Sequence, residues 1–205
     1  NCICETGVMG KSVGHGEALD RLVEGNKRFA NSQSYHQSVA EDARRQMAQG
    51  QRPFAVILTC ADSRVPPSQI FDHGLGEVFS IRIAGNVPSD AVVGSIEFAV
   101  THLGSRLVVV MGHEKCGAVQ AAIEGERDAH LYAITDLIQP AVAKARAFEG
   151  NLLENCIRVH ATMVAENLRH QGPVLSKACQ EGSLKVVPAY YRFETGVVEF
   201  LEGLL

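Results

Sequence analysis

The chain has 205 residues, of which 46% are hydrophobic and 20% charged, and its formal net charge is -4 at pH 7. This length suits one domain with a substantial core. The balanced charge, without a long basic run, argues against nucleic acid or an anionic membrane as partner, and no apolar stretch is as long as a membrane span. We therefore expect a soluble protein that acts on a small molecule.

The first elements expected along the chain are helical. Residues 1–16 contain four glycines and are expected to form a flexible arm. Apolar residues recur at helical spacing from about 17 to 31, and a second helix is expected over about 39–49, ended by Gly50. We find no internal repeat or boundary further along, so residues 17–205 are expected to form a single domain.

The central part of the chain alternates between strand and helix patterns. Continuous apolar runs predict strands that are buried on both faces, over residues 54–59, 78–83 and 107–111. Helices are expected over residues 66–72, 91–102, 118–124, 131–148 and 152–170, and a final strand pair over 184–191 and 196–201. This order predicts an α/β fold with a mostly parallel central sheet flanked by helices, an N-terminal helical arm and a C-terminal strand pair.

Two motifs with metal-ligand chemistry follow the first and third predicted strands. Cys60 begins the segment Cys-Ala-Asp-Ser-Arg, and His113 begins His-Glu-Lys-Cys-Gly, which contains Cys116. Because parallel strands place their carboxyl ends at one edge of a sheet, we expect these three side chains to meet. Two thiolates and one imidazole suit zinc and leave a fourth tetrahedral position to fill.

An acid and a base lie within the first motif, spaced to pair with each other. Asp62 can accept a hydrogen bond from zinc-bound water and orient the resulting hydroxide, or it can displace the water and become a fourth zinc ligand. The planar guanidinium of Arg64 can hold Asp62 away from the metal. We expect higher pH to favour the open arrangement, with Asp62 on Arg64.

The residues alone leave two other interpretations open. In one, the zinc site is structural, Asp62 is the permanent fourth ligand and Arg64 is a surface residue. In the other, no metal binds, and the two cysteines and the histidine are unrelated core residues. The second motif argues against the metal-free interpretation, because it adds a His-x-x-Cys pair on a second strand end.

The motifs and the segments around them resemble the β-class carbonic anhydrases over about residues 17–201. The similar segments are residues 60–68, 71–79, 82–86, 95–99 and 189–196. The resemblance implies zinc on Cys60, His113 and Cys116, with Asp62 and Arg64 as the catalytic pair and Asp62 on the metal only in a closed state. The implied reaction is the reversible hydration of carbon dioxide to bicarbonate and a proton by zinc-bound hydroxide.

The resemblance also implies a substrate pocket and an assembly. Gln51 is expected to donate a hydrogen bond to bicarbonate, Phe79 to form an apolar wall, and Gly117 to leave room beside a metal ligand. Taken without the family, Gln51 is a solvated loop residue and Phe79 is equally well a core residue. Family members place the active site at a subunit interface, so a homodimer or a dimer of dimers is expected.

Some positions depart from patterns found in parts of the family. Phe98 stands where plant-like members often have tyrosine, and Ile57 stands where some bacterial members have the tryptophan of an inhibitory bicarbonate pocket. Arg82 matches the arginine of that pocket, but one residue does not make a pocket. We therefore do not expect this form of inhibition by bicarbonate.

Other questions stay open at this stage. Hydrolysis of carbon disulfide or carbonyl sulfide is an alternative reaction for the same ligand set. His73 is a candidate for passing the product proton to solvent, and Glu114 and Lys115 are expected to face solvent. The chain begins with Asn1 rather than Met, which is compatible with a cytoplasmic protein and equally with one exported to the periplasm.

Overall fold

The computed structural model describes residues 12–35, 44–45 and 47–201. Their strands form one sheet in the order β2-β1-β3-β4-β5. The strands are β1 (Ala55–Thr59), β2 (Val78–Arg82), β3 (Leu107–His113), β4 (Lys185–Tyr191) and β5 (Val198–Phe200). The first four run parallel to their neighbours and β5 pairs antiparallel with β4. The predicted α/β class, the mostly parallel sheet and the final strand pair are therefore confirmed.

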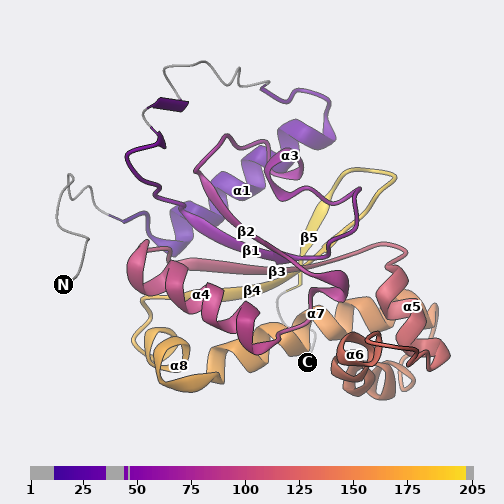
Figure 1. Cartoon of the computed structure of the whole chain (residues 1–205). Helices are drawn as coiled ribbons and strands as arrows, with labels where there is room; N and C mark the ends of the chain where they lie inside the picture. Colours follow the sequence, from indigo (N-terminus) through magenta and orange to yellow (C-terminus); the bar gives the residue numbers. More distant parts are fainter. Residues whose placement is uncertain (1–11, 36–43, 46, 202–205) are drawn as a thin grey trace.

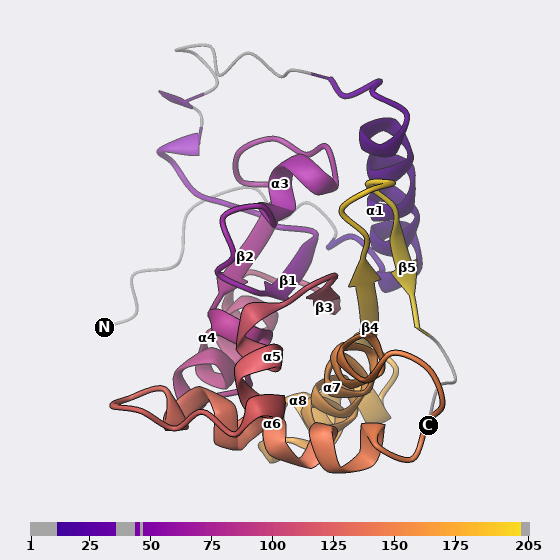
Figure 2. The ribbon, with the colours of Figure 1, turned by 90° about the vertical axis from the view of Figure 1, so that its right-hand side faces the viewer.

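Helices cover both faces of the sheet. Figure 1 shows α1 (His15–Ala30) and the short α3 (Pro67–Ile70) on one side. On the other side lie α4 (Asp90–His102), α7 (Leu152–His170) and α8 (Gly172–Gln180). The remaining helices, α5 (Gly117–Glu124) and α6 (Tyr132–Ala145), pack beside α7 (Figure 2). None of the described helices combines the length and the hydropathy needed to cross a membrane.

The strand order creates the place where a site can form. From β1 the chain moves outward to β2 and then returns to the opposite side of β1 to make β3. This reversal of direction between β1 and β3 is a topological switch point, the place where open α/β sheets position their ligands at the carboxyl ends of the strands. Cys60 follows β1 directly and His113 ends β3, so both motifs lie at this switch point.

The central strands hold the core together because both of their faces are covered. All five residues of β1 are buried. Side chains alternate between the faces of a strand, so Val56 and Leu58 pack with residues of α4 and α7, whereas Ala55 and Ile57 pack with residues of α1 and α3. A third cluster joins α5, α6 and α7 and includes Cys60 and Cys116. The metal-ligand candidates thus sit on rigid, packed elements.

Several boundaries differ from those expected. The third strand continues to His113, two residues past the predicted end, because Gly112 lets α7 pack against it: a Cβ at Gly112 would lie 2.7 Å from Ile157 Cγ2. The helix α8 has no counterpart among the predicted elements. The helix predicted over 39–49 falls mostly on residues outside the described ranges, as does most of the arm 1–16. The division into an arm and a domain over 17–205 stays a prediction.

Candidate metal centre

Three side chains from separate parts of the chain converge at the carboxyl edge of the sheet. The ligand atoms of Cys60, His113 and Cys116 all lie within 4.8 Å of one another. These residues come from the end of β1, the end of β3 and the N-cap of α5. Their exposed fractions are 5%, 0% and 1%. The convergence predicted from the strand order is present, and the site is closed to bulk solvent on the ligand side.

The orientation of His113 shows that the cluster fits a metal ion. Its Nδ1 lies 2.9 Å from the carbonyl oxygen of Glu114. A carbonyl only accepts, so Nδ1 carries the ring proton and Nε2 has a free lone pair. This Nε2 is buried and has no hydrogen-bond partner. Buried polar atoms are rarely left without a partner, and a cation between His113 and the two cysteines would provide one.

The two thiols are arranged to lose their protons to a cation. A hydrogen bond from Cys116 is the main reason that the pKa of Cys60 falls to about 4, and the same bond, with burial, raises the pKa of Cys116. The pair therefore shares one proton, which a metal ion would displace. Backbone N–H groups of Asp62 and Gly85 donate to Cys60 Sγ at 3.4 and 3.3 Å. The donor set of two thiolates and one neutral imidazole is one that zinc favours.

Asp62 is turned toward Arg64 and away from the cluster. Its Oδ1 accepts hydrogen bonds from the Arg64 backbone N–H and Nε, both at 2.9 Å, and its Oδ2 accepts from Nη2 at 2.7 Å. Its Oδ2 lies 4.0 Å from Nε2 of His113. The hydrogen bonds from Arg64 hold the pKa of Asp62 well below its usual range. The structure therefore shows the open arrangement, with an ionised carboxylate beside the cluster.

Arg82 braces the loop that carries Cys60 and Asp62. Its Nε donates to the carbonyl oxygen of Cys60 at 3.2 Å and its Nη2 donates to that of Asp62. Arg82 reaches this loop because β2 pairs with β1 in a register that sets it opposite Thr59. Sequence reasoning considered Arg82 only as part of an inhibitory pocket, because strand register is not visible in the motif itself.

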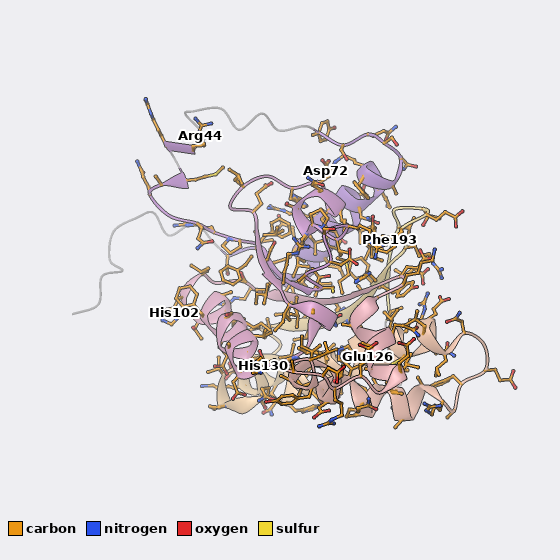
Figure 3. All side chains as sticks on the ribbon, turned by 45° about the vertical axis from the view of Figure 1, so that its right-hand side comes forward. Arg44, Asp72, His102, Glu126, His130 and Phe193 are labelled. Atoms are coloured by element: carbon orange, nitrogen blue, oxygen red, sulfur yellow. The ribbon has the colours of Figure 1, made fainter. Side chains whose placement is uncertain are left out.

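Phe193 is a second residue that sequence reasoning missed. It lies in the loop between β4 and β5 (Figure 3), with its ring centroid 4.2 Å from Arg64 Cζ and 5.4 Å from the ring of His113. Its backbone N–H donates to Glu114 Oε2 at 3.0 Å. Glu114 therefore turns to this loop rather than to solvent, contrary to expectation, whereas the side chain of Lys115 is 74% exposed.

Two of the three predicted substrate residues, Gln51 and Phe79, lie apart from the cluster within this chain, whereas Gly117 adjoins it. Gln51 is exposed and precedes β1, whereas Cys60 follows it, and five residues of strand separate their ends by about 13 Å. Phe79 pairs with Val56 near the amino end of β1 and packs on the core. Gly117 begins α5 next to Cys116, and a Cβ there would meet no atom within 4 Å.

His73 is held on the face of the sheet that α1 covers. Its ring meets that of Phe54 at 4.8 Å between centroids, and Nε2 lies 3.3 Å from the carbonyl oxygen of Arg21. Nδ1 lies 3.5 Å from Glu77. None of these contacts joins His73 to the metal ligands, so its suggested role in proton transfer gains no support from its surroundings.

An α/β fold with a Cys-His-Cys centre at a switch point and an adjacent Asp-Arg pair defines a zinc enzyme of the carbonic anhydrase type. A family model described as carbonic anhydrase matches residues 55–198. Carbonic anhydrase 2 of Mycobacterium tuberculosis is 38% identical over 184 residues, which cover 87% of this chain and 89% of that protein. The carbonic anhydrase of Mycolicibacterium smegmatis is 35% identical over 192 residues, 91% and 93% of the two chains.

Comparison with solved structures agrees. The β-carbonic anhydrase of Coccomyxa, solved in complex with acetazolamide, superimposes with a TM-score of 0.71 at 27% identity. The match covers 89% of this chain and 86% of that one. The chain belongs to the β-class carbonic anhydrase family.

Proposed function

We infer that this protein catalyses the reversible hydration of carbon dioxide to bicarbonate and a proton. This inference rests mainly on the convergence of Cys60, His113 and Cys116. Beside them, Arg64 binds the ionised carboxylate of Asp62 and so leaves the fourth ligand position free. The three ligands would hold zinc, which supplies a Lewis acid that activates water. Membership of the family supports the same reaction.

The roles of the surrounding residues follow from their contacts. Asp62 stays ionised, so it can accept a hydrogen bond from the reacting water and turn the water's lone pair toward carbon dioxide. Arg64 occupies both carboxylate oxygens of Asp62 and so keeps this residue from filling the open ligand position. Arg82 fixes the backbone that carries both Cys60 and Asp62. The protein thus orients the reactants while the ligand position stays free.

A pH-indicator assay with dissolved carbon dioxide tests the proposal. We expect the wild type to hydrate carbon dioxide and Asp62→Asn to be slower by roughly 10- to 100-fold, because an amide binds Arg64 less well and orients water less well. Zinc content should be equal in the two proteins, since Asp62 is not a ligand in the open arrangement. Equal, near-zero rates in both, with zinc bound, would support a structural zinc protein instead.

Carbon disulfide and carbonyl sulfide are alternative substrates for the same ligands. The same purified protein should be assayed with each of them beside carbon dioxide, at matched concentrations. We expect the rate with carbon dioxide to exceed both. A higher rate with either sulfur compound would replace the proposed reaction by hydrolysis of that compound.

We further propose that the functional unit is a homodimer or a dimer of dimers in which Gln51 and Phe79 serve the site of a second copy. The support is that both residues lie toward the amino ends of β1 and β2, whereas the ligand cluster lies at the carboxyl ends. A pocket that uses them together with Cys60 therefore needs another chain. Gln51 would then donate a hydrogen bond to bicarbonate bound at the neighbouring cluster.

Mixing two inactive variants tests this arrangement. A Cys60→Ser chain lacks a ligand but keeps Gln51, and a Gln51→Ala chain keeps the ligands. If Gln51 acts on the partner's site, reassembled mixtures should recover activity that neither variant shows alone. Light scattering of the wild type gives the size of the assembly, and a monomer with full activity would contradict the proposal.

A further inference from the structure

A chain of hydrogen bonds links a buried histidine of α7 to the Cys60 thiol through the backbone of a single residue, Gly85. His160 is 2% exposed, and its Nε2 lies 2.9 Å from the carbonyl oxygen of Gly85. Because a carbonyl only accepts, Nε2 carries the ring proton and donates it. The N–H of the same Gly85 donates to Cys60 Sγ at 3.3 Å. The connection thus runs from His160 to Gly85 and then to Cys60.

The glycine in this chain is held tightly in place. Its φ of +67° lies in the left-handed region that favours glycine. A Cβ there would lie 2.8 Å from Ile138 Cδ1 and 3.2 Å from Ala118 Cβ. The backbone at Gly85 is therefore enclosed by α5 and α6, and His160 holds its carbonyl from α7. The carbonyl and the N–H of Gly85 lie in successive peptide planes that meet at its Cα, so a shift of the carbonyl that moves this Cα also moves the N–H that faces Cys60.

Burial keeps the histidine in the neutral, donating form. It lowers the pKa of His160 to about 4, against a smaller upward effect of the bond to Gly85. His160 therefore acts as a fixed donor at neutral pH rather than as a charge. Within the described part of the chain, His160 makes no hydrogen bond to a metal ligand, so its influence on the centre passes through the backbone of Gly85.

We propose that His160 is a positioning residue that aims the Gly85 N–H at the Cys60 thiolate and thereby weakens the donation of that thiolate to the metal. This inference rests on the zinc centre proposed above. Two thiolates neutralise the charge of a zinc ion and make it a weaker Lewis acid than three histidines do. A hydrogen bond to a thiolate withdraws part of its charge. The contact from Gly85 would therefore help a two-thiolate centre to activate water.

Two amide substitutions at one position separate this role from simple packing. The side-chain nitrogen of Gln reaches about as far as histidine Nε2, whereas that of Asn reaches only as far as Nδ1. His160→Gln should therefore keep the bond to Gly85, and His160→Asn should lose it. The measurements are the zinc dissociation constant by chelator competition and the thiolate-to-cobalt absorption band of the Co²⁺-loaded protein.

The two variants are expected to differ clearly. His160→Asn should lower the zinc dissociation constant and move the cobalt band to lower energy, because a thiolate that has lost this hydrogen bond is richer in electrons and donates more strongly to the metal. His160→Gln should match the wild type in both. Thr162→Val is the control in α7: it removes a hydrogen bond to the carbonyl oxygen of Arg158 and should change stability without changing the band.

The outcomes separate this inference from the proposed function. A wild type that binds neither zinc nor cobalt overturns both. A wild type that binds zinc, with His160→Asn unchanged in affinity and spectrum, overturns the positioning role alone. If His160→Asn does not fold, NMR of the wild type loaded with ¹¹³Cd gives the test. Scalar coupling between cadmium and the Gly85 amide proton supports the connection, and its absence overturns it.

Discussion

The guanidinium of Arg64 lies over the ring of Phe193, with Cζ 4.2 Å from the ring centroid. The same guanidinium makes two hydrogen bonds to the carboxylate of Asp62. The loop between β4 and β5 thus supports the residue that keeps Asp62 off the metal position. Because the side chain of Arg64 is 54% exposed, its orientation depends on such contacts rather than on burial.

This contact predicts a moderate loss of activity in Phe193→Leu. Without the ring, Arg64 samples more orientations and holds Asp62 less firmly, so kcat/KM for carbon dioxide should fall about two- to fivefold. Phe193→Tyr keeps the ring and should behave as the wild type does. In a protein that already carries Arg64→Ala, adding Phe193→Leu should lower kcat/KM little further. An equal effect of Phe193→Leu in both backgrounds would contradict the assigned contact.

Removing zinc should lower the melting temperature. Metal bound only by the folded state adds about 2.7 kcal/mol when its free concentration is 100 times the dissociation constant, which corresponds to roughly 5–10 °C for a chain of this size. Chelator treatment of the wild type, followed by calorimetry, measures this shift. Cys116→Ser should show the low value without chelator. Cys156→Ala, at a buried cysteine outside the cluster, should keep its zinc and its response to the chelator.

Packing of α7 on β3 predicts a stability loss in Gly112→Ala. The added Cβ would lie 2.7 Å from Ile157 Cγ2, and overpacking of this kind costs about 1–3 kcal/mol. Urea denaturation should show the loss, and Ile157→Ala in the same chain should make the glycine substitution less costly. Gly94→Ala is the control, because a Cβ at that helical position meets no atom within 4 Å. It should stabilise the protein by about 0.5–1 kcal/mol.

Because burial lowers the pKa of His160, we expect the protein to become less stable on acidification. Its folded-state pKa is about 4, below the ordinary value of 6.5, so between these values the unfolded chain binds a proton that the folded chain excludes. Stability therefore rises with pH across this window, by roughly 3 kcal/mol in total, and levels off above pH 6.5. The free energy of unfolding of chelator-treated protein should be measured by urea denaturation at several pH values. It should rise more steeply with pH in the wild type than in His160→Gln. If the free energy of unfolding changes equally with pH in both proteins, His160 does not cause the pH dependence of stability.

Periodicity and motif spacing were sufficient to predict the mostly parallel sheet and the convergence of three candidate metal ligands. The segments that form β1 and β3 are buried on both faces, so each is a continuous apolar run. Such a run can be recognised in the sequence without knowledge of any distant contact. Cys60 and His113 follow from the same rule, because the ends of parallel strands meet at one edge. The pairing of Asp62 with Arg64 is equally local, since a single residue, Ser63, separates them along the chain.

Only the tertiary structure decided which other side chains support the centre. Arg82, Phe193 and His160 reach it through strand register, a loop and a helix that lie far from the motifs in the sequence. The direction of His113 Nε2 likewise depends on the backbone of Glu114. The type of a side chain shows what it can bind. Hydrogen bonds act only within about 3–4 Å, so tertiary packing determines which partners a side chain has.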